Sequence, residues 1–469
     1  MSINSINQLI KSDKSECFRR AFIKRRSIVT GQFESSWYDV SDNIKKYGKI
    51  SVKADDLKLN KFTFANAKLV CDNEDGLFNP HTSESSLWNG YLNQQRTLVK
   101  YEAGFVERTK DSGGVWTNIE WLAESLWDQS IWDQANSIWD GVGTSLFYGV
   151  ISGDIPLSDS NEVTLNIRPL VSIFQDYPAR NLTGWTSTGV TASQFVQMVM
   201  NQTDGSSNYI FLPFFGNTST GYELSTTSNI YTTLNTSGAV GVLDKTVWQV
   251  IEKLAEAESY IPYINKQGVF KFVSREVNTT TVAFEFHGTG SHSGAYGHTI
   301  KKISNYGSKQ SKFYSRVETK FIDADTITSF VVSEGSFTVS PGSSAWVLGV
   351  RTLKVENFFI PNTATASAIT TDLFNEYSAL KNEIEFTTSF IPQLDLLDRI
   401  SIYYDPSEVN NRNLWDQNNW AADDTSTALD LIFDASSGDA IKLSGEEFKF
   451  LSIEIDLDNL ECKYLAREI

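Results

Sequence analysis

The stretch Leu126-Trp127-Asp128-Gln129, followed by Trp132, returns later in the chain as Leu414-Trp415-Asp416-Gln417, followed by Trp420. Only 12 of the 469 residues are Trp, so the shared string LWDQxxW indicates an internal repeat. A repeat of this kind decides how the rest of the sequence is divided, because each copy must sit in the same structural surroundings.

The segments around the two copies correspond as well. Each copy follows one alternating apolar stretch and precedes two more, so the order strand, Trp-rich insertion, strand, turn, strand occurs twice. The matched stretches are Arg96–Tyr101, Leu146–Ile151 and Val163–Ile167 in the first copy, and Arg399–Tyr404, Phe448–Ile453 and Glu461–Leu465 in the second. We infer a duplicated β domain and expect residues 96–168 and 399–468 to superpose, with both insertions projecting from the same place.

A different pattern fills the sequence between the copies. Residues 245–260 repeat apolar side chains at helical spacing, and residues 263–272 predict a β-hairpin with a Lys-Gln-Gly turn. Two more helices are predicted at 191–200 and 363–381, and a short strand around 209–211. The expected fold is therefore mainly β, with an α+β middle module between the two copies.

Composition limits the class of protein. A chain of 469 residues exceeds one core and indicates two to four domains. The net charge of −17 argues against broad binding of nucleic acid phosphates, although an acidic wall could let DNA pass without sticking. Three scattered cysteines, Cys17, Cys71 and Cys462, predict neither a disulfide framework nor a zinc site. The polar first 15 residues do not resemble a signal peptide, and no membrane segment is expected.

Motifs for catalysis are missing from the sequence. It contains no GxSxG, P-loop, HExxH, CxxC or dinucleotide fingerprint. Three of the four histidines lie in HGTGSHSGAYGH, residues 287–298, which the surrounding Gly and Ser predict to be a flexible linker. The turn-rich segment 72–80 fails the calcium-loop template, because Cys71 and Thr82 fall where carboxylates are needed. We expect no enzyme activity, no metal and no cofactor.

One region of this acidic chain is basic. It contains Arg19 and, within a predicted strand over residues 20–30, Arg20, Lys24, Arg25 and Arg26. One interpretation is a charged edge strand that resists aggregation. The other is a contact with an acidic neighbouring protein.

Several segments in this order resemble the tail hub proteins of tailed bacteriophages, the family of the trimeric baseplate hub and its siphophage minor-tail relatives. The most specific motif contains Asn73, Asp75, Gly76, Phe78 and Pro80, in an Asn-x-Asp-Gly-x-Phe-x-Pro pattern. The other matching segments are Phe33–Ser41, Phe147–Ile151, Val247–Arg275 and Thr363–Lys381. Longer family members add a fibre, spike or peptidase extension, whereas this sequence ends at Ile469 after the second copy, so we expect no such domain.

The resemblance implies a tube-like β-barrel fold for both copies. It divides the chain into a first tube-like domain (1–175, with a Trp-rich insertion at about 113–143), a middle α/β module (176–286) and a second tube-like domain (287–469, with a shorter insertion at about 407–440). A trimer would then present six similar domains in a ring, which matches a six-fold tail tube above and a three-fold tip below.

The implied partners are two further copies of this chain, a tail tube or distal tail protein ring above, a tip, spike or fibre protein below, and the tape measure protein. DNA would transit without specific binding. The implied location is the tail tip of the virion, after synthesis in the host cytoplasm.

Two other functions stay open on the sequence. Exposed Trp side chains in the insertions could bind carbohydrate, which would make the protein a receptor-binding tail adhesin. The many carboxylates could include a catalytic pair of a hydrolase acting on cell wall or capsule. In both insertions Trp127, Trp132, Trp415 and Trp420, with Asp128 and Asp416, equally suit compact loops held together by their own indoles.

Overall fold

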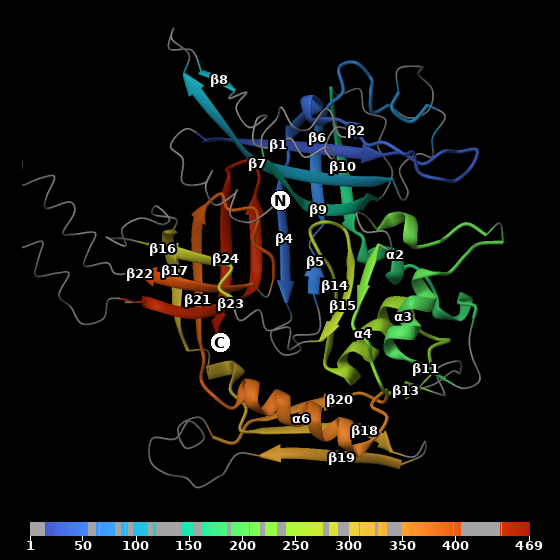
Figure 1. The fold of residues 1–469 in the computed structure, drawn as a ribbon, viewed down its shortest axis with the longest axis vertical. Helices are drawn as coiled ribbons and strands as arrows, with labels where there is room; N and C mark the ends of the chain where they lie inside the picture. The colour runs from blue at the N-terminus through green and yellow to red at the C-terminus, as the bar shows by residue number, and fades with distance from the viewer. Residues whose placement is uncertain are drawn as a thin grey trace, which may run out of the picture.

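The computed structural model describes residues 15–54, 62–64, 66–79, 86–89, 91, 97–110, 116–118, 142–152, 161–184, 189–205, 207–215, 221–231, 241–274, 281–288, 300–308, 310–323, 327–334, 349–396, 398–404, 441 and 443–469. Figure 1 shows two β-sheets stacked along the longest axis of the molecule, with helices and smaller sheets beside and below them. Both LWDQ strings, Pro80 and most of the histidine segment lie outside the described residues.

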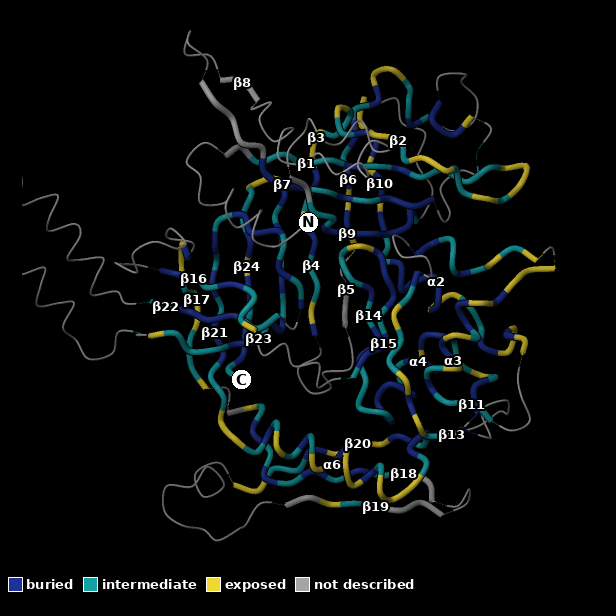
Figure 2. The backbone as a smooth tube through the Cα atoms, viewed as in Figure 1, coloured by how far each residue is buried: buried dark blue, intermediate teal, exposed yellow. Residues whose placement is uncertain are grey.

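The first sheet has the spatial order β2-β1-β7-β9-β10-β6-β3, and β8 pairs with β7. Its strands are β1 (Ser15–Lys24), β2 (Tyr38–Asp39), β3 (Ile44–Lys46), β6 (Ala67–Asp72), β7 (Leu98–Lys110), β8 (Trp116–Asn118), β9 (Val142–Ile151) and β10 (Glu162–Pro169). Strict alternation sets the buried face, as in β10, where Val163, Leu165 and Ile167 are buried while Glu162 and Thr164 are exposed. The neighbouring strand β6 shows a similar alternation, whereas residues 146–151 of β9 are all buried (Figure 2).

The second sheet has the order β16-β22-β23-β24-β21-β17. Its strands are β16 (Phe284–His287), β17 (Ile300–Ser308), β21 (Asn382–Ser389), β22 (Arg399–Tyr404), β23 (Leu443–Asp456) and β24 (Glu461–Glu468). The predicted linker at 287–298 is wrong at its first residue, because His287 ends β16 and stacks on Tyr403 with ring centroids 4.9 Å apart. Pairing of β16 with β22 buries the His287 side chain, although the Gly and Ser residues that follow it suggested an exposed segment.

The two sheets have the same order over six strands. The six strands β1, β3, β6, β7, β9 and β10 take the same positions, in the same chain order, as β16, β17, β21, β22, β23 and β24. Both insertion-bearing hairpins also shift register near the same point, between Tyr101 and Glu102 in one and between Ile402 and Tyr403 in the other. The edge strands differ, since β1 runs antiparallel to β7 whereas β16 runs parallel to β22. This repeated order is what the sequence predicts for a duplicated β domain.

A hairpin from the first half of the chain completes the second sheet. Strands β4 (Lys49–Ala54) and β5 (Phe62–Phe64) pair with each other, and β4 adds to β23 beyond the end of β22. Residues from both sheets, with Ile50 and Ala54 of β4, form one hydrophobic core. The sheets are therefore joined through backbone pairing as well as side-chain packing.

The middle module packs its helices on a second core. Helices α3 (Ala192–Met200) and α4 (Val247–Glu258) both begin with a capping box, in which Thr191 pairs with Gln194 and Thr246 with Gln249. The remaining elements are α2 (Val171–Gln175), β11 (Val190–Thr191), β12 (Tyr222–Leu224), β13 (Ile230–Tyr231), β14 (Tyr260–Ile264) and β15 (Phe270–Ser274), with short 3-10 turns at Ala179–Asn181 and Leu212–Phe214. The strand predicted at 209–211 is wrong: Tyr209 makes a single bridge, and the chain then enters the 3-10 turn.

A small unit lies between β17 and β21. It contains a 3-10 turn (Gln310–Lys312), β18 (Arg316–Asp323), β19 (Ile327–Glu334), β20 (Thr352–Glu356) and α6 (Thr363–Tyr377). Its apolar side chains, Val317, Phe321, Ile369 and Leu373 among them, share the core of the middle module. In the first half of the chain, the corresponding link between β3 and β6 carries the β4–β5 hairpin. The three-domain division at 175 and 286 stays a prediction, and strand pairing crosses both limits through β4 and β16.

Within the described residues, no helix combines the length and apolarity needed to cross a bilayer.

Candidate functional site

The segment Asn73–Asn79 folds as a compact turn directly after β6. The Asn73 side chain accepts a hydrogen bond from the Phe78 amide at 2.8 Å and donates one to Asn79 at 2.9 Å. Gly76 has φ of +73°, a left-handed conformation that favours glycine. Asp75 accepts a bond from the Leu77 amide at 3.0 Å, which leaves the Phe78 ring fully buried. These contacts suit a structural role for Asn73, Asp75, Gly76 and Phe78.

Each basic residue of β1 and its extension has a contact inside the chain. Arg19 donates to the Leu457 carbonyl at 2.5 Å and so ties β1 to the turn between β23 and β24. Arg20 lies over the Phe18 ring, and Lys24 lies over Trp37. Burial, with Lys100 nearby, lowers the pKa of Lys24. The expected contact of this segment with a neighbouring protein remains a proposal.

Arg25 and Arg26 brace a hairpin beyond β1. Arg25 donates two hydrogen bonds to Glu34, both 2.7 Å long, and lies 4.0 Å from the centre of the Tyr91 ring. The hydrogen bonds to Glu34 raise the pKa of Arg25. Arg26 donates to the Gly31 carbonyl and lies over the Phe33 ring.

The outward face of the second sheet is charged, and its charges pair across strands. Lys49 of β4 lies 3.0 Å from Glu454 of β23, and Lys463 of β24 lies 2.5 Å from Glu385 of β21. Lys301 of β17 lies 2.8 Å from Glu461 of β24. Each of these exposed ammonium groups therefore has a carboxylate beside it.

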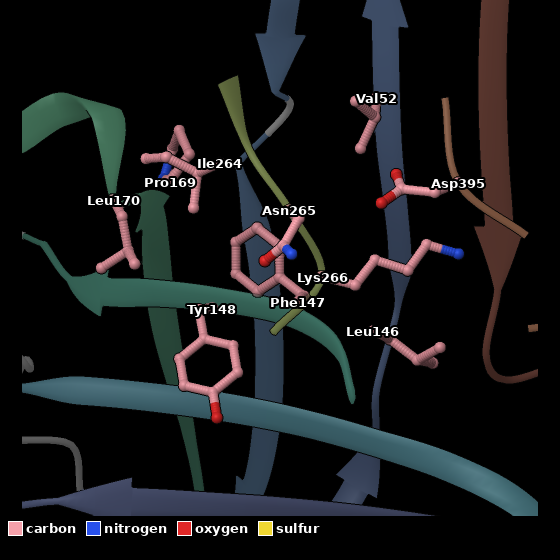
Figure 3. Close-up of a pocket in the computed structure, with 10 residues that line it drawn as sticks. All are labelled: Val52, Leu146, Phe147, Tyr148, Pro169, Leu170, Ile264, Asn265, Lys266 and Asp395. Carbon is pink, nitrogen blue, oxygen red and sulfur yellow. The ribbon is translucent and has the colours of Figure 1, made fainter. Parts of the chain in front are cut away.

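A small cavity marks the place where the middle module meets both sheets (Figure 3). Its volume of about 20 Å³ holds a water molecule and excludes a cofactor or sugar. Its lining comes from β4, β9, the end of β10, the β14–β15 turn and the link between β21 and β22: Val52, Leu146, Phe147, Tyr148, Pro169, Leu170, Ile264, Asn265, Lys266 and Asp395. The cavity is therefore a junction of modules, not a ligand pocket.

The β14–β15 turn is shaped to enter this junction. The Asn265 side chain accepts hydrogen bonds from the amides of Gln267 at 3.0 Å and Val269 at 2.9 Å. Gly268 has φ of +73°, and a Cβ there would lie 2.9 Å from the Tyr148 ring of β9. A side chain at Gly268 would therefore clash with the first sheet.

Lys266, at the tip of that turn, reaches the second sheet. Its side chain is partly buried, and its ammonium group donates to the Pro392 carbonyl at 2.8 Å and to the Leu394 carbonyl. Burial lowers the pKa of Lys266, against the opposing effect of Asp395 and Asp398. Figure 3 shows the Lys266 side chain extending from the turn toward the segment that carries Asp395.

Asp398 closes the same link. It accepts a hydrogen bond from the Asp395 amide at 2.8 Å, and burial raises its pKa to about 6. The other end of the link is tied to β24, where the Tyr464 hydroxyl donates to the Ile391 carbonyl at 3.0 Å.

Sequence reasoning missed these residues. It placed Lys266 correctly in a hairpin turn, but an isolated lysine in a turn is normally exposed. The available signal was the pair Asp395 and Asp398 in the mostly apolar stretch Ile391–Asp398. Such carboxylates need a partner, which the sequence does not identify.

A second charged cluster joins α6 to the second sheet. Glu376 of α6 lies 3.3 Å from Lys449 of β23, 3.7 Å from Arg467 of β24 and 3.3 Å from Lys381. Burial alone would raise the pKa of Glu376, but these three cations lower it. The cluster is a structural anchor for the small unit.

Nothing in the described residues forms a metal centre: no three His, Cys, Asp or Glu side chains there gather closely enough to hold an ion. The Trp residues of the repeat, with Asp128 and Asp416, lie outside the described residues. Their segments nevertheless occupy the same link of the two sheets, since one connects β8 to β9 and the other connects β22 to β23.

No protein-family model matches the chain, and comparison with curated proteins finds no match. Its fold is similar to that of a tail protein from Neisseria meningitidis MC58, at TM-score 0.47 and 9% identity over 96% of both chains. It is also similar to the 43 kDa tail protein of prophage MuSo2 from Shewanella oneidensis, at TM-score 0.43 and 11% identity over 96% of this chain and 98% of that one. A prophage tail protein from Listeria monocytogenes EGD-e has TM-score 0.41 and 8% identity over 96% of this chain and 94% of that one. All three neighbours are named as tail proteins, and two of them as tail proteins of prophages.

Proposed function

We propose that this chain is a structural hub protein of a bacteriophage tail tip or baseplate. The observation that carries the proposal is the repeated topology, in which six strands take the same order twice within one chain. A protein with two equivalent sheets offers two equivalent positions in a ring, and a single-site binding protein has no need of them.

The symmetry follows from this repeat. Closed homo-oligomers use rotational symmetry, and three copies with two equivalent sheets each present six similar sheets. Such a trimer can contact a six-fold tube through its sheets and a three-fold tip through the parts that occur once per chain. Here those parts are the middle module and the α6 unit, which share one core.

The joint between the sheets suits a structural role, because it holds the two sheets together. Strand β4 pairs with β23 over five residue pairs, from Lys49↔Asp456 to Lys53↔Ser452. Because this joint uses backbone hydrogen bonds and a shared core, the sheets of one protomer would hold a fixed relation in the ring.

A DNA conduit needs a wall without unpaired cations, because each free Lys or Arg adds salt-sensitive attraction for phosphate. The outward face of the second sheet meets this need in part, at its Lys49–Glu454, Lys463–Glu385 and Lys301–Glu461 pairs. We infer that such a face could line the channel, with its low affinity for DNA arising from paired charges together with the chain's net charge of −17.

The proposed partners are two copies of the same chain, a tail tube or distal tail ring above and a tip, spike or fibre protein below. The role is structural, so we propose no catalytic residue, metal or cofactor. The site of action would be the virion tail.

Native mass spectrometry of the purified full chain tests the oligomeric state that this role needs. A mass of three chains supports the hub. A stable monomer, both alone and mixed with tail tube protein, would contradict it.

A further inference from the structure

Outside the surfaces assigned to the hub, the most unusual charged side chain is Lys266, which is partly buried and whose ammonium group bonds to the backbone of another module. It lies at the tip of a hairpin from one module and bonds to backbone carbonyls of another, Pro392 and Leu394. Buried lysines are uncommon, since desolvation of the charge is unfavourable unless partners compensate. A lysine used only for packing would not need two acceptors.

Lys266 lies where the two sheets meet. The cavity beside it is lined by Val52 of β4 and by Leu146 and Phe147 of β9, so it opens between the strand that joins the sheets and the first sheet itself. The link that accepts the lysine bonds leads from β21 into β22. The hairpin tip thus touches both sheets at once, through Tyr148 on one side and through the link on the other.

We propose that Lys266 acts as a latch between the two sheets. Its ammonium group holds the hairpin tip (residues 265–268) against the link at residues 390–398. When these hydrogen bonds break, both segments open as one unit. The stem of the hairpin stays in place on opening, because Ile261 is a buried member of the core that the two sheets share. The sheets also stay folded, because their strand pairing does not involve the tip.

The charged and titratable groups around the latch set its response to pH. Facing Asp398 are Lys266 and Tyr263 from the hairpin, Asp395 from the link, and Tyr464 from β24, while Cys462 of β24 faces Lys266. Burial raises the pKa of Tyr263, Tyr464 and Cys462, so these three groups stay neutral near pH 7.

Asp398 gives the sign of that response. Its pKa is about 6 in the closed structure, above the ordinary value of 3.8 for an exposed aspartate. The closed form therefore binds the proton more tightly than the open form, and acid favours closure. Between pH 7 and pH 5, these two pKa values shift the closed-to-open ratio by about tenfold toward the closed form.

Hydrogen–deuterium exchange of the full chain, read by mass spectrometry, tests the latch. Lys266→Met keeps the length and apolar stem of the side chain and removes the charge and its donors. We expect exchange to rise about tenfold or more at the tip residues 265–268 and in peptides covering 390–398, and to stay unchanged in the hairpin stem, β7 and β24. Lys271→Met is the matched control, because Lys271 is on the same hairpin and pairs at the surface with Glu223, 3.0 Å away.

The pH arm uses the unaltered chain and Asp398→Asn, so it does not depend on the folding of the lysine variant. After division by the intrinsic chemical rate, exchange at the tip should slow about tenfold from pH 7 to pH 5 in the unaltered chain and lose that dependence in Asp398→Asn. Equal tip exchange in Lys266→Met and the unaltered chain would overturn the latch. So would a rise spread over both sheets, or the same pH dependence in Asp398→Asn. These outcomes are independent of the oligomer mass that tests the hub.

Discussion

Lys49 of β4 donates to Glu454 of β23 across 3.0 Å, although the two residues are 405 positions apart in the chain. The contact marks the strand that the first half of the protein contributes to the sheet of the second half. A protein built from two matched sheets is thereby made into one unit, because the second sheet is not complete without the β4–β5 hairpin from the first half of the chain.

This joint predicts that the two sheets unfold together. Ile50 of β4 is 2% exposed within the shared core, so Ile50→Ala should lower the free energy of unfolding by about 2–4 kcal/mol. Guanidinium titration should show one transition, shifted as a whole. Lys49→Met at the exposed end of β4 is the control and should change stability by less than about 1 kcal/mol. Two separate transitions, with only one of them moved, would show that the sheets are independent.

The turn that enters the junction predicts a second, local effect. Gly268→Ala adds a Cβ 2.9 Å from the Tyr148 ring at φ of +73°. Gly31→Ala has a similar φ of +66° and nothing within 4 Å, so it measures the backbone term alone. We expect about 1 kcal/mol of destabilisation at Gly31 and distinctly more at Gly268, measured by chemical denaturation. Equal losses would mean that Tyr148 moves aside freely.

The cluster that anchors α6 predicts a pH-dependent stability. Glu376→Gln leaves Lys381, Lys449 and Arg467 without their shared carboxylate and should destabilise the chain by about 3 kcal/mol at pH 7. Since these cations lower the pKa of Glu376, its stabilisation is present above the pKa of an unfolded glutamate and is lost as pH falls through the lower folded value. The variant and the unaltered chain should therefore converge in acid. Glu461→Gln, in an exposed pair with Lys301, should show little effect.

The sequence predicts the local strands and their repeat, but not the contacts between segments that lie far apart in the chain. The repeat and the strands around it followed from alternation and two LWDQ strings, because short-range patterns determine which face of a strand is buried. The pairing of β4 with the second sheet could not be predicted, since the alternating pattern of residues 49–54 fits either sheet equally well. Lys266 was likewise visible only as a turn residue, because its acceptors are carbonyls of a link over a hundred residues away.

Variants of Arg25 can show whether the basic segment acts only within the chain or also contacts a neighbouring protein. Arg25→Glu should destabilise the chain, because it places two carboxylates together where a double hydrogen bond stood. The charge swap Arg25→Glu with Glu34→Arg should restore most of that stability, measured by thermal unfolding. If assembly into particles stays impaired in the stable swap, the segment also contacts a neighbour; normal assembly would limit its role to the hairpin.

We expect substitution of Trp in the two insertions to reduce stability or assembly rather than ligand binding. Truncation of a well-packed Trp, as in Trp127→Ala or Trp415→Ala, typically lowers stability by about 3–5 kcal/mol. Melting curves and a glycan array on the same preparations distinguish the two roles. Normal melting with lost glycan binding would favour a receptor-binding adhesin.

The central claim is that three copies of this chain form a ring of six related sheets at the tail tip. An electron-microscopy map of the intact particle tests it most directly, because it gives copy number and position together. We expect three copies around the tail axis, with the two sheets of each chain alternating around a six-fold-like ring next to the tube. Six copies in that ring, or a position at the periphery of the tail away from the axis, would contradict it.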